Sequence, residues 1–125
     1  MKKTKFRNIT LTSGSHVILG KNAEQNEMLV NQFKGKENII LHTAESGSPF
    51  CVINEYSPSK KDIKGTAVVC AVYSQDWRDN KNNVLVHKFT GMDVYKEKGM
   101  KTGMWGVKNF EVIEVKKQDI EKWQN

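Results

Sequence analysis

The chain has 125 residues, a length typical of one domain, and 38% of them are apolar. No stretch approaches the roughly 18 consecutive apolar residues that a membrane-spanning helix requires, and charges of both signs are interspersed, so the composition excludes a membrane-spanning protein and argues against wholesale disorder. Lys and Arg number 20 against 14 Asp and Glu, which gives a net charge of +6 and makes a nucleic-acid or other acidic partner worth considering.

The N-terminal third predicts a hairpin followed by a helix. Residues 9–19 read as a β-hairpin, because two short strand-like runs flank a turn of Thr, Ser and Gly. Asn22 is a favourable N-cap, and Gln25, three residues later, can close a capping box on its backbone. A helix is therefore predicted over about 23–33, and Gly35 ends it.

Two strands and a second helix are predicted in the middle of the chain. The β-rich runs are 38–42 and 50–54, and the loop between them contains Gly and Pro. Ser59 and Asp62 repeat the capping-box spacing and predict the start of a helix over about 60–76. This helix is apolar on nearly all sides, so we expect it to be buried across the main sheet.

The last third predicts three strands, at 84–89, 104–107 and 110–115, and a short helix at 118–123. A long loop rich in Lys and Gly, 90–103, joins the first two strands, and loops of this length are often functional. The order of elements predicts a single α+β domain: a mostly antiparallel sheet with two main helices and a short C-terminal helix.

The residues that could support catalysis form no familiar constellation. The histidines, His16, His42 and His87, fall in predicted strands without the spacing of a metal site. Cys51 and Cys70 lie in apolar runs, where a thiol behaves as a small buried hydrophobe. Cys51 could act with His42 as nucleophile and base only if adjacent strands aligned them, and an apolar thiol is normally inert. We therefore expect no enzyme activity, no metal and no cofactor.

Eighteen of the 20 basic residues are Lys, which suits contacts to phosphate better than the reading of base edges. Twelve of the 20 basic residues fall in four clusters: Lys2, Lys3, Lys5 and Arg7; Lys60, Lys61 and Lys64; Lys96, Lys98 and Lys101; Lys116 and Lys117. Trp77, Tyr95 and Trp105 stand near basic residues or the Gly-rich loop, where exposed rings could stack on bases. The core is the more common place for Trp105 and Phe110, and a merely solvated Lys-rich surface is the alternative to nucleic-acid binding.

Several segments, in chain order, carry a family resemblance. They are Gly20–Leu29 with its glycine–basic–asparagine opening, the strand Asn38–His42, the small-residue helix Ala67–Ser74, and the strand and glycine loop Val84–Lys88, Val94–Lys96 and Gly99–Met104. In this order they are similar to the NFACT-R domain, over about residues 15–116. That domain is the RNA-binding portion of ribosome quality-control factors that add C-terminal tails to stalled nascent chains, and it also occurs alone. The resemblance therefore implies a standalone RNA-binding domain.

The chain departs from the family pattern at three places. Ile40 and Leu41 stand where the family usually has Trp and Phe, Pro49 stands where it usually has a His, and Thr102 stands where Pro is common. These changes either repack the core or adapt the domain to a different ligand, and the residues leave both readings open.

We predict a non-catalytic RNA-binding domain over residues 1–125 that contacts tRNA or ribosomal RNA mainly through backbone phosphates. DNA and the ribosome itself are further candidate partners, and no membrane partner is expected. The alternative is a protein-interaction module that docks on a ribosomal or other acidic partner. No apolar run follows the basic N-terminus, so we expect no signal peptide and a cytoplasmic protein. The predicted binding residues are Lys21, Asn22, His42, Arg78, Lys96, Lys98 and Lys101.

Overall fold

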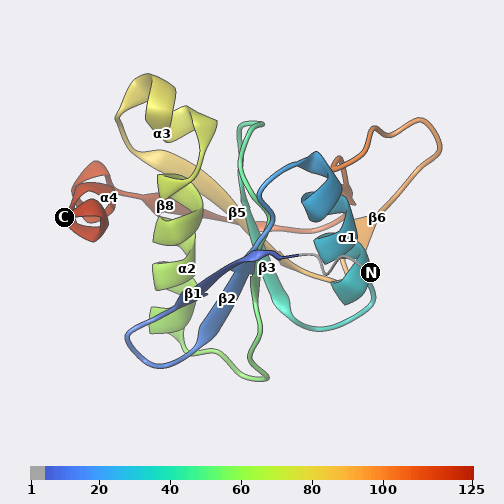
Figure 1. Ribbon diagram of the computed structural model, residues 1–125, viewed down its shortest axis with the longest axis horizontal. Coiled ribbons are helices and arrows are strands. Elements are labelled where there is room, and N and C mark those ends of the chain that lie inside the picture. Colours follow the sequence, from blue (N-terminus) through green and yellow to red (C-terminus); the bar gives the residue numbers. More distant parts are fainter. Residues whose placement is uncertain (1–4) are drawn as a thin grey trace.

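A six-stranded sheet runs through the centre of the computed structural model, which describes residues 5–125 (Figure 1). Every neighbouring pair of strands in it is antiparallel. In sheet order the strands are β1 (Arg7–Thr10), β2 (His16–Leu19), β4 (Cys51–Ile53), β3 (Ile39–Thr43), β5 (Val84–Thr90) and β8 (Glu111–Val115). The predicted α+β class with a mostly antiparallel sheet is confirmed.

Helices and a small β-ribbon complete the described part of the fold. The helices are α1 (Ala23–Phe33), α2 (Lys60–Val72), α3 (Gln75–Asn80) and α4 (Lys117–Gln124), and the ribbon pairs β6 (Val94–Tyr95) with β7 (Gly106–Val107). The first hairpin and the first helix lie where the sequence predicts them. The prediction of an unbroken loop over 90–103 is wrong, because β6 lies within it, and the strand predicted over 104–107 is limited to the two residues of β7.

The second helix ends earlier than predicted, and a separate helix follows it. α2 stops at Val72, and Ser74 then serves as the N-cap of α3. The Ser74 hydroxyl accepts from the backbone N–H of Trp77 at 3.1 Å and donates to the carbonyl of Ala71 at 2.7 Å. A Ser side chain that competes for backbone groups in this way ends one helix and starts another. One helix over 60–76 is therefore a wrong prediction at its C-terminal end.

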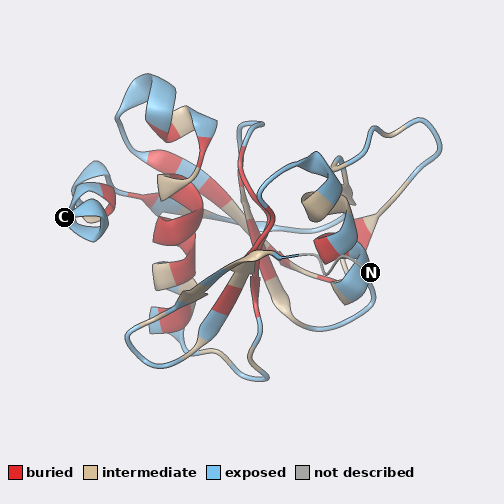
Figure 2. Ribbon diagram, in the orientation of Figure 1, coloured by how far each residue is buried: buried red, intermediate tan, exposed pale blue. Residues whose placement is uncertain are grey.

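The two faces of the sheet belong to two separate cores. Successive residues of a strand point to opposite faces, so in β3 Leu41 packs toward α2 while Ile40 packs toward α1. α2 crosses β3, β4, β5 and β8 and is buried along much of its length, as predicted (Figure 2). α1 covers the opposite face with Leu29 and Val30. Burying one such side chain stabilises the fold by about 1.5–3 kcal/mol, so apolar packing holds both helices to the sheet.

The sheet separates the groups that a nucleophile and its base would need. Cys51 and Cys70 are fully buried in the core beneath α2, whereas His42 lies on the α1 face of the sheet beside Phe50. The sulfur atoms of Cys51 and Cys70 lie 3.9 Å and 3.8 Å from the carbonyl oxygen of Pro49. Burial raises the pKa of Cys51 well above its ordinary value, and the neighbouring Cys70 raises it further. Both thiols therefore act as packing groups.

Cys51→Ser and Cys70→Ser are each expected to lower the free energy of unfolding by about 1–3 kcal/mol, because each places a hydroxyl in an apolar core. Urea denaturation of the two variants measures this loss. In the native protein both thiols should react slowly with a thiol reagent, at a rate set by opening of the fold. Rapid labelling of Cys51 at neutral pH would contradict the packing role.

Candidate nucleic-acid interface

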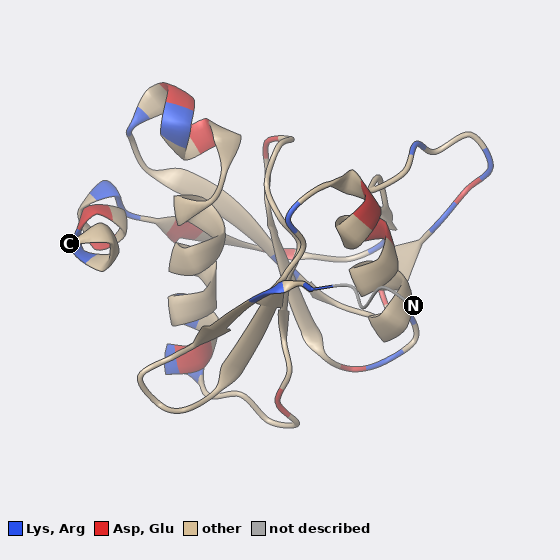
Figure 3. Cartoon of the chain, in the orientation of Figure 1, with Lys and Arg blue, Asp and Glu red and all other residues tan. Residues whose placement is uncertain are grey.

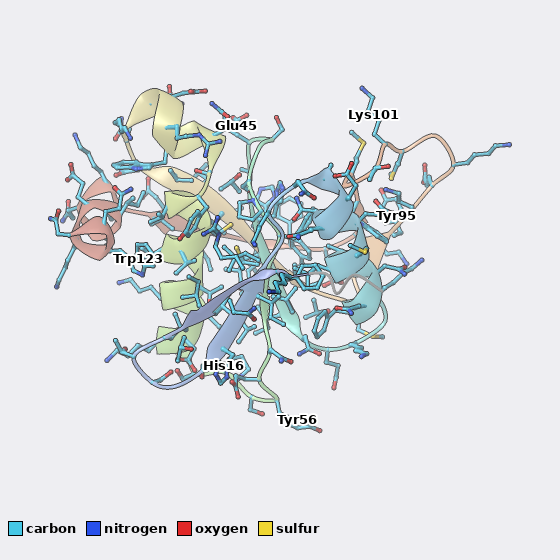
Figure 4. The ribbon with its side chains drawn as sticks, in the orientation of Figure 1. His16, Glu45, Tyr56, Tyr95, Lys101 and Trp123 are labelled. Atoms are coloured by element: carbon cyan, nitrogen blue, oxygen red, sulfur yellow. The ribbon has the colours of Figure 1, made fainter. Side chains whose placement is uncertain are left out.

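A groove with a volume of about 830 Å³ opens on the α1 side of the sheet. Its walls come from the N-terminal end of α1, the loop that joins β3 to β4, the start of α3, and the chain from Lys101 to Phe110. Figure 4 labels Lys101 and Glu45 at the same end of the molecule, and it places Tyr56 and His16 at the other end. The volume is typical of a site that takes a small ligand or part of a larger one.

Five of the seven predicted binding residues line this groove. They are Lys21, Asn22, His42, Arg78 and Lys101. They come from the segment that leads into α1, from β3, from α3 and from the loop after β6, so only the tertiary fold brings them together. Lys98 is exposed in the same loop as Lys101 but does not line the groove.

Asn22 fixes the end of α1 at the groove. Its side-chain oxygen accepts a hydrogen bond from the backbone N–H of Gln25 at 2.9 Å, as the capping prediction requires. The second half of the predicted capping box is wrong by one residue, because Gln25 Oε1 accepts from the backbone N–H of Lys21 at 2.9 Å. This bond orders the backbone that carries the Lys21 side chain.

Lys96 holds the loop in place and does not line the groove. Its ammonium group donates to Glu27 Oε1 at 2.7 Å and to the carbonyls of Lys101 and Met104 at 2.8 Å and 2.6 Å. Three donors are all that an ammonium group has, so no proton of Lys96 remains for a phosphate. The Lys96 ammonium also lies 5.0 Å from the centre of the Trp105 ring. We therefore assign Lys96 a positioning role in place of the predicted phosphate contact.

Gly103 brings the same loop against α1. Its backbone N–H donates to Glu27 Oε1 at 2.7 Å, and its φ of +84° lies in the left-handed region that favours glycine. A Cβ atom on Gly103 would stand 3.0 Å from the Cα atom of Ala23, in the first turn of α1. Close approach and positive φ together require glycine here.

Positive charge surrounds the groove, and the lining residues found within 5–125 include neither Asp nor Glu. The cations that line it are Arg7, Lys21, Arg78 and Lys101. Figure 3 shows that Lys and Arg are also spread over the rest of the molecule, so the groove is distinguished by a lining that, among residues 5–125, has cations but no Asp or Glu. The predicted N-terminal cluster contributes Arg7, whereas Lys2 and Lys3 lie outside the described residues.

Two pairs of rings, one tilted and one stacked, lie in the lining of the groove, on β3 and β5 and just before β4 and β8. The His42 and Phe50 ring centres lie 4.3 Å apart, and the His87 and Phe110 rings are stacked with centres 4.0 Å apart and an interplanar angle of 22°. His42 and His87 are direct partners in the β3–β5 register. Burial lowers the pKa of both imidazoles, so both are neutral at neutral pH.

The sequence prediction omitted several groove residues. Arg7 and Tyr73 form a cation–π contact, with the guanidinium carbon 4.4 Å from the ring centre. Trp105 is partly buried, in agreement with the expected core position, but Phe110 keeps 49% of its surface exposed, so its expected core position is wrong. In the sequence, Arg7 belongs to a basic cluster and Phe110 lies two residues after a Lys. Neither signal places the residue in a groove, because the groove forms only when the strands pair in their register.

The described part of the chain offers neither a metal site nor a membrane span. No group of three His, Cys, Asp or Glu residues within 5–125 is arranged to hold a metal ion. None of the helices over the same range is long and apolar enough to span a membrane.

Comparison with known proteins identifies the family. The chain is 31% identical over 92 residues to the Rqc2 homolog RqcH of Bacillus subtilis, a match that covers 74% of this chain and 16% of that protein. The structure of the C-terminal part of the fibronectin/fibrinogen-binding protein of Streptococcus suis has the same fold, with a TM-score of 0.83 and 22% identity over 98% of this chain and 50% of that one. The chain thus spans a half or less of these relatives. The model of the NFACT protein RNA binding domain matches residues 5–109, and the chain therefore belongs to the NFACT RNA-binding domain family.

Proposed function

We propose that this chain binds RNA without catalysing a reaction, and that the groove is the binding site. The observation that supports this most is the lining itself: cations from separate elements surround it, and no acidic residue of the described chain lines it. Phosphate is the group that such a rim would hold, because Lys and Arg contacts to the backbone supply most of the affinity in nonspecific nucleic-acid binding. The bonds that fix Lys96 and Gly103 keep the rim preorganised.

The expected ligand is tRNA or ribosomal RNA, in translation or ribosome quality control. Membership of the NFACT RNA-binding domain family supports RNA as the ligand class, and the similarity to RqcH supports the setting. Contacts to phosphate should dominate, so the binding should tolerate unrelated sequences.

Binding of a tRNA and of an unrelated structured RNA, measured by fluorescence anisotropy over a series of salt concentrations, tests the proposal. We expect both RNAs to bind at low salt, with log K falling linearly as log salt rises. A slope of about −2 to −4 would correspond to roughly three to five phosphates, at about 0.7–0.9 for each. Absence of binding to both RNAs at low salt would contradict the proposal and favour a protein partner for this surface.

A further inference from the structure

The rings of His42, Phe50, His87 and Phe110 form a row across the sheet in the lining of the groove. His42 on β3 and His87 on β5 are register partners and lie on the same face. Phe50 extends the row on one side of His42, and Phe110 stacks on His87. Because one face of the Phe110 ring lies against His87 and 49% of the residue is exposed, its other face is open to a ligand.

The imidazole of His42 presents a hydrogen-bond acceptor. Its Nδ1 lies 2.8 Å from the carbonyl oxygen of Thr43, and because a carbonyl only accepts, Nδ1 carries the proton. The neutral ring then has a lone pair on Nε2. His42 is partly buried and lines the groove, and within residues 5–125 its Nε2 makes no hydrogen bond, so this lone pair is left for a donor from a ligand.

The neutral rings of the groove suit the base of a nucleotide, and the cations around them suit its phosphates. A base stacks on aromatic faces, and the phosphates on either side of it carry the charge that Lys21, Arg78 and Lys101 would bind. A double-stranded RNA keeps its bases inside the stack and presents phosphates and sugars, so it could reach the cations but not the rings. Unpaired nucleotides can reach both.

We propose that the groove takes an unstacked base of single-stranded RNA, which stacks on the exposed face of Phe110 and donates a hydrogen bond to Nε2 of His42. The inference rests on the proposed RNA binding and specifies its substrate as an unpaired segment. Every RNA base carries an N–H donor, so this contact selects an unpaired base over a paired one without selecting its identity.

The test compares a short single-stranded RNA with the same strand annealed to its complement, at one salt concentration, for three proteins. Wild type should bind the single strand at least about 5-fold more tightly than the duplex. Phe110→Ala should weaken single-strand binding by about 5- to 150-fold and leave duplex binding unchanged, and Phe110→Tyr should restore it. Tyr56→Ala is the matched control, since Tyr56 is a fully exposed ring remote from Lys101 (Figure 4).

A 2-aminopurine in the strand supplies a second readout. Stacking on Phe110 should change its fluorescence on binding to wild type and not on binding to Phe110→Ala. Equal, salt-dependent binding of single strand and duplex, with no effect of Phe110→Ala, would overturn the base site and leave the proposed function standing. Loss of all RNA binding in wild type would overturn the proposed function itself. Melting curves of the variants check that the exposed substitution leaves the fold intact.

Discussion

Replacing Lys21 and Lys101 together with Ala is expected to flatten the dependence of log K on log salt by about 1.4–1.8, because each lost phosphate contact removes about 0.7–0.9. Both side chains are exposed and line the groove from different elements. The loss of affinity should be similar for unrelated RNAs, because phosphate contacts position a chain without reading its bases. Anisotropy titrations over a series of salt concentrations measure both quantities.

The matched control is Lys60→Ala with Lys61→Ala, which removes the same charge from exposed positions at the start of α2, outside the groove. This pair should leave the slope close to the wild-type value. Equal flattening by the two pairs would show that charge acts diffusely over the surface, and the groove would lose its assignment. Lys98→Ala should flatten the slope by an amount between those of the two pairs, because Lys98 lies in the same loop as Lys101 but does not line the groove.

Lys96→Met is expected to lower the free energy of unfolding by about 1.5–3 kcal/mol, the range for hydrogen bonds that involve a charged group. The variant loses the bonds to Glu27, Lys101 and Met104 while keeping an unbranched side chain of similar length. Urea denaturation measures the loss. Lys98→Met in the same loop is the control, and a change within about 0.5 kcal/mol is expected for this exposed position.

Glu27 makes the stability difference between wild type and Lys96→Met depend on pH. Burial alone would raise the pKa of Glu27, but the hydrogen bonds from Lys96 and Gly103, with the charge of Lys96, hold it below the ordinary value of 4.5. A carboxyl group with a lowered folded pKa stabilises the fold above its unfolded pKa, and this contribution is lost as the pH falls through the folded pKa. The difference in the free energy of unfolding between wild type and Lys96→Met should therefore be largest above pH 4.5, the ordinary pKa of Glu, and should shrink as the pH falls below it. A gap independent of pH would argue against the ion pair as its source.

Local signals in the sequence were sufficient for the first helix and the sheet class. Asn22 and Gln25 define the start of α1 through contacts within a few residues, and the alternation of β3 and β5 is visible in the chain itself. The break after α2 was missed because a continuous apolar pattern runs through it, and the capping hydroxyl of Ser74 carries a weaker signal than that pattern.

The site residues depended on contacts that no local pattern contains. Lys96 looks like any solvated Lys in the chain, and its partner Glu27 lies 69 positions away. His42 and His87 become neighbours only through the β3–β5 register. Lys21, Asn22 and Lys101, which lie in the segments that carry the family resemblance, all line the groove, and their binding role stays a prediction.

The two faces of the sheet differ in what they carry. The core beneath α2 contains both cysteines and most of the buried aliphatic side chains, while the groove opens on the opposite face. Substitutions at sites without shared contacts usually have additive effects. Volume-conserving substitutions in that core should therefore leave the groove undisturbed where they contact none of its lining. Cys51 and Cys70 are the exception, because both contact the carbonyl of Pro49, which lines the groove.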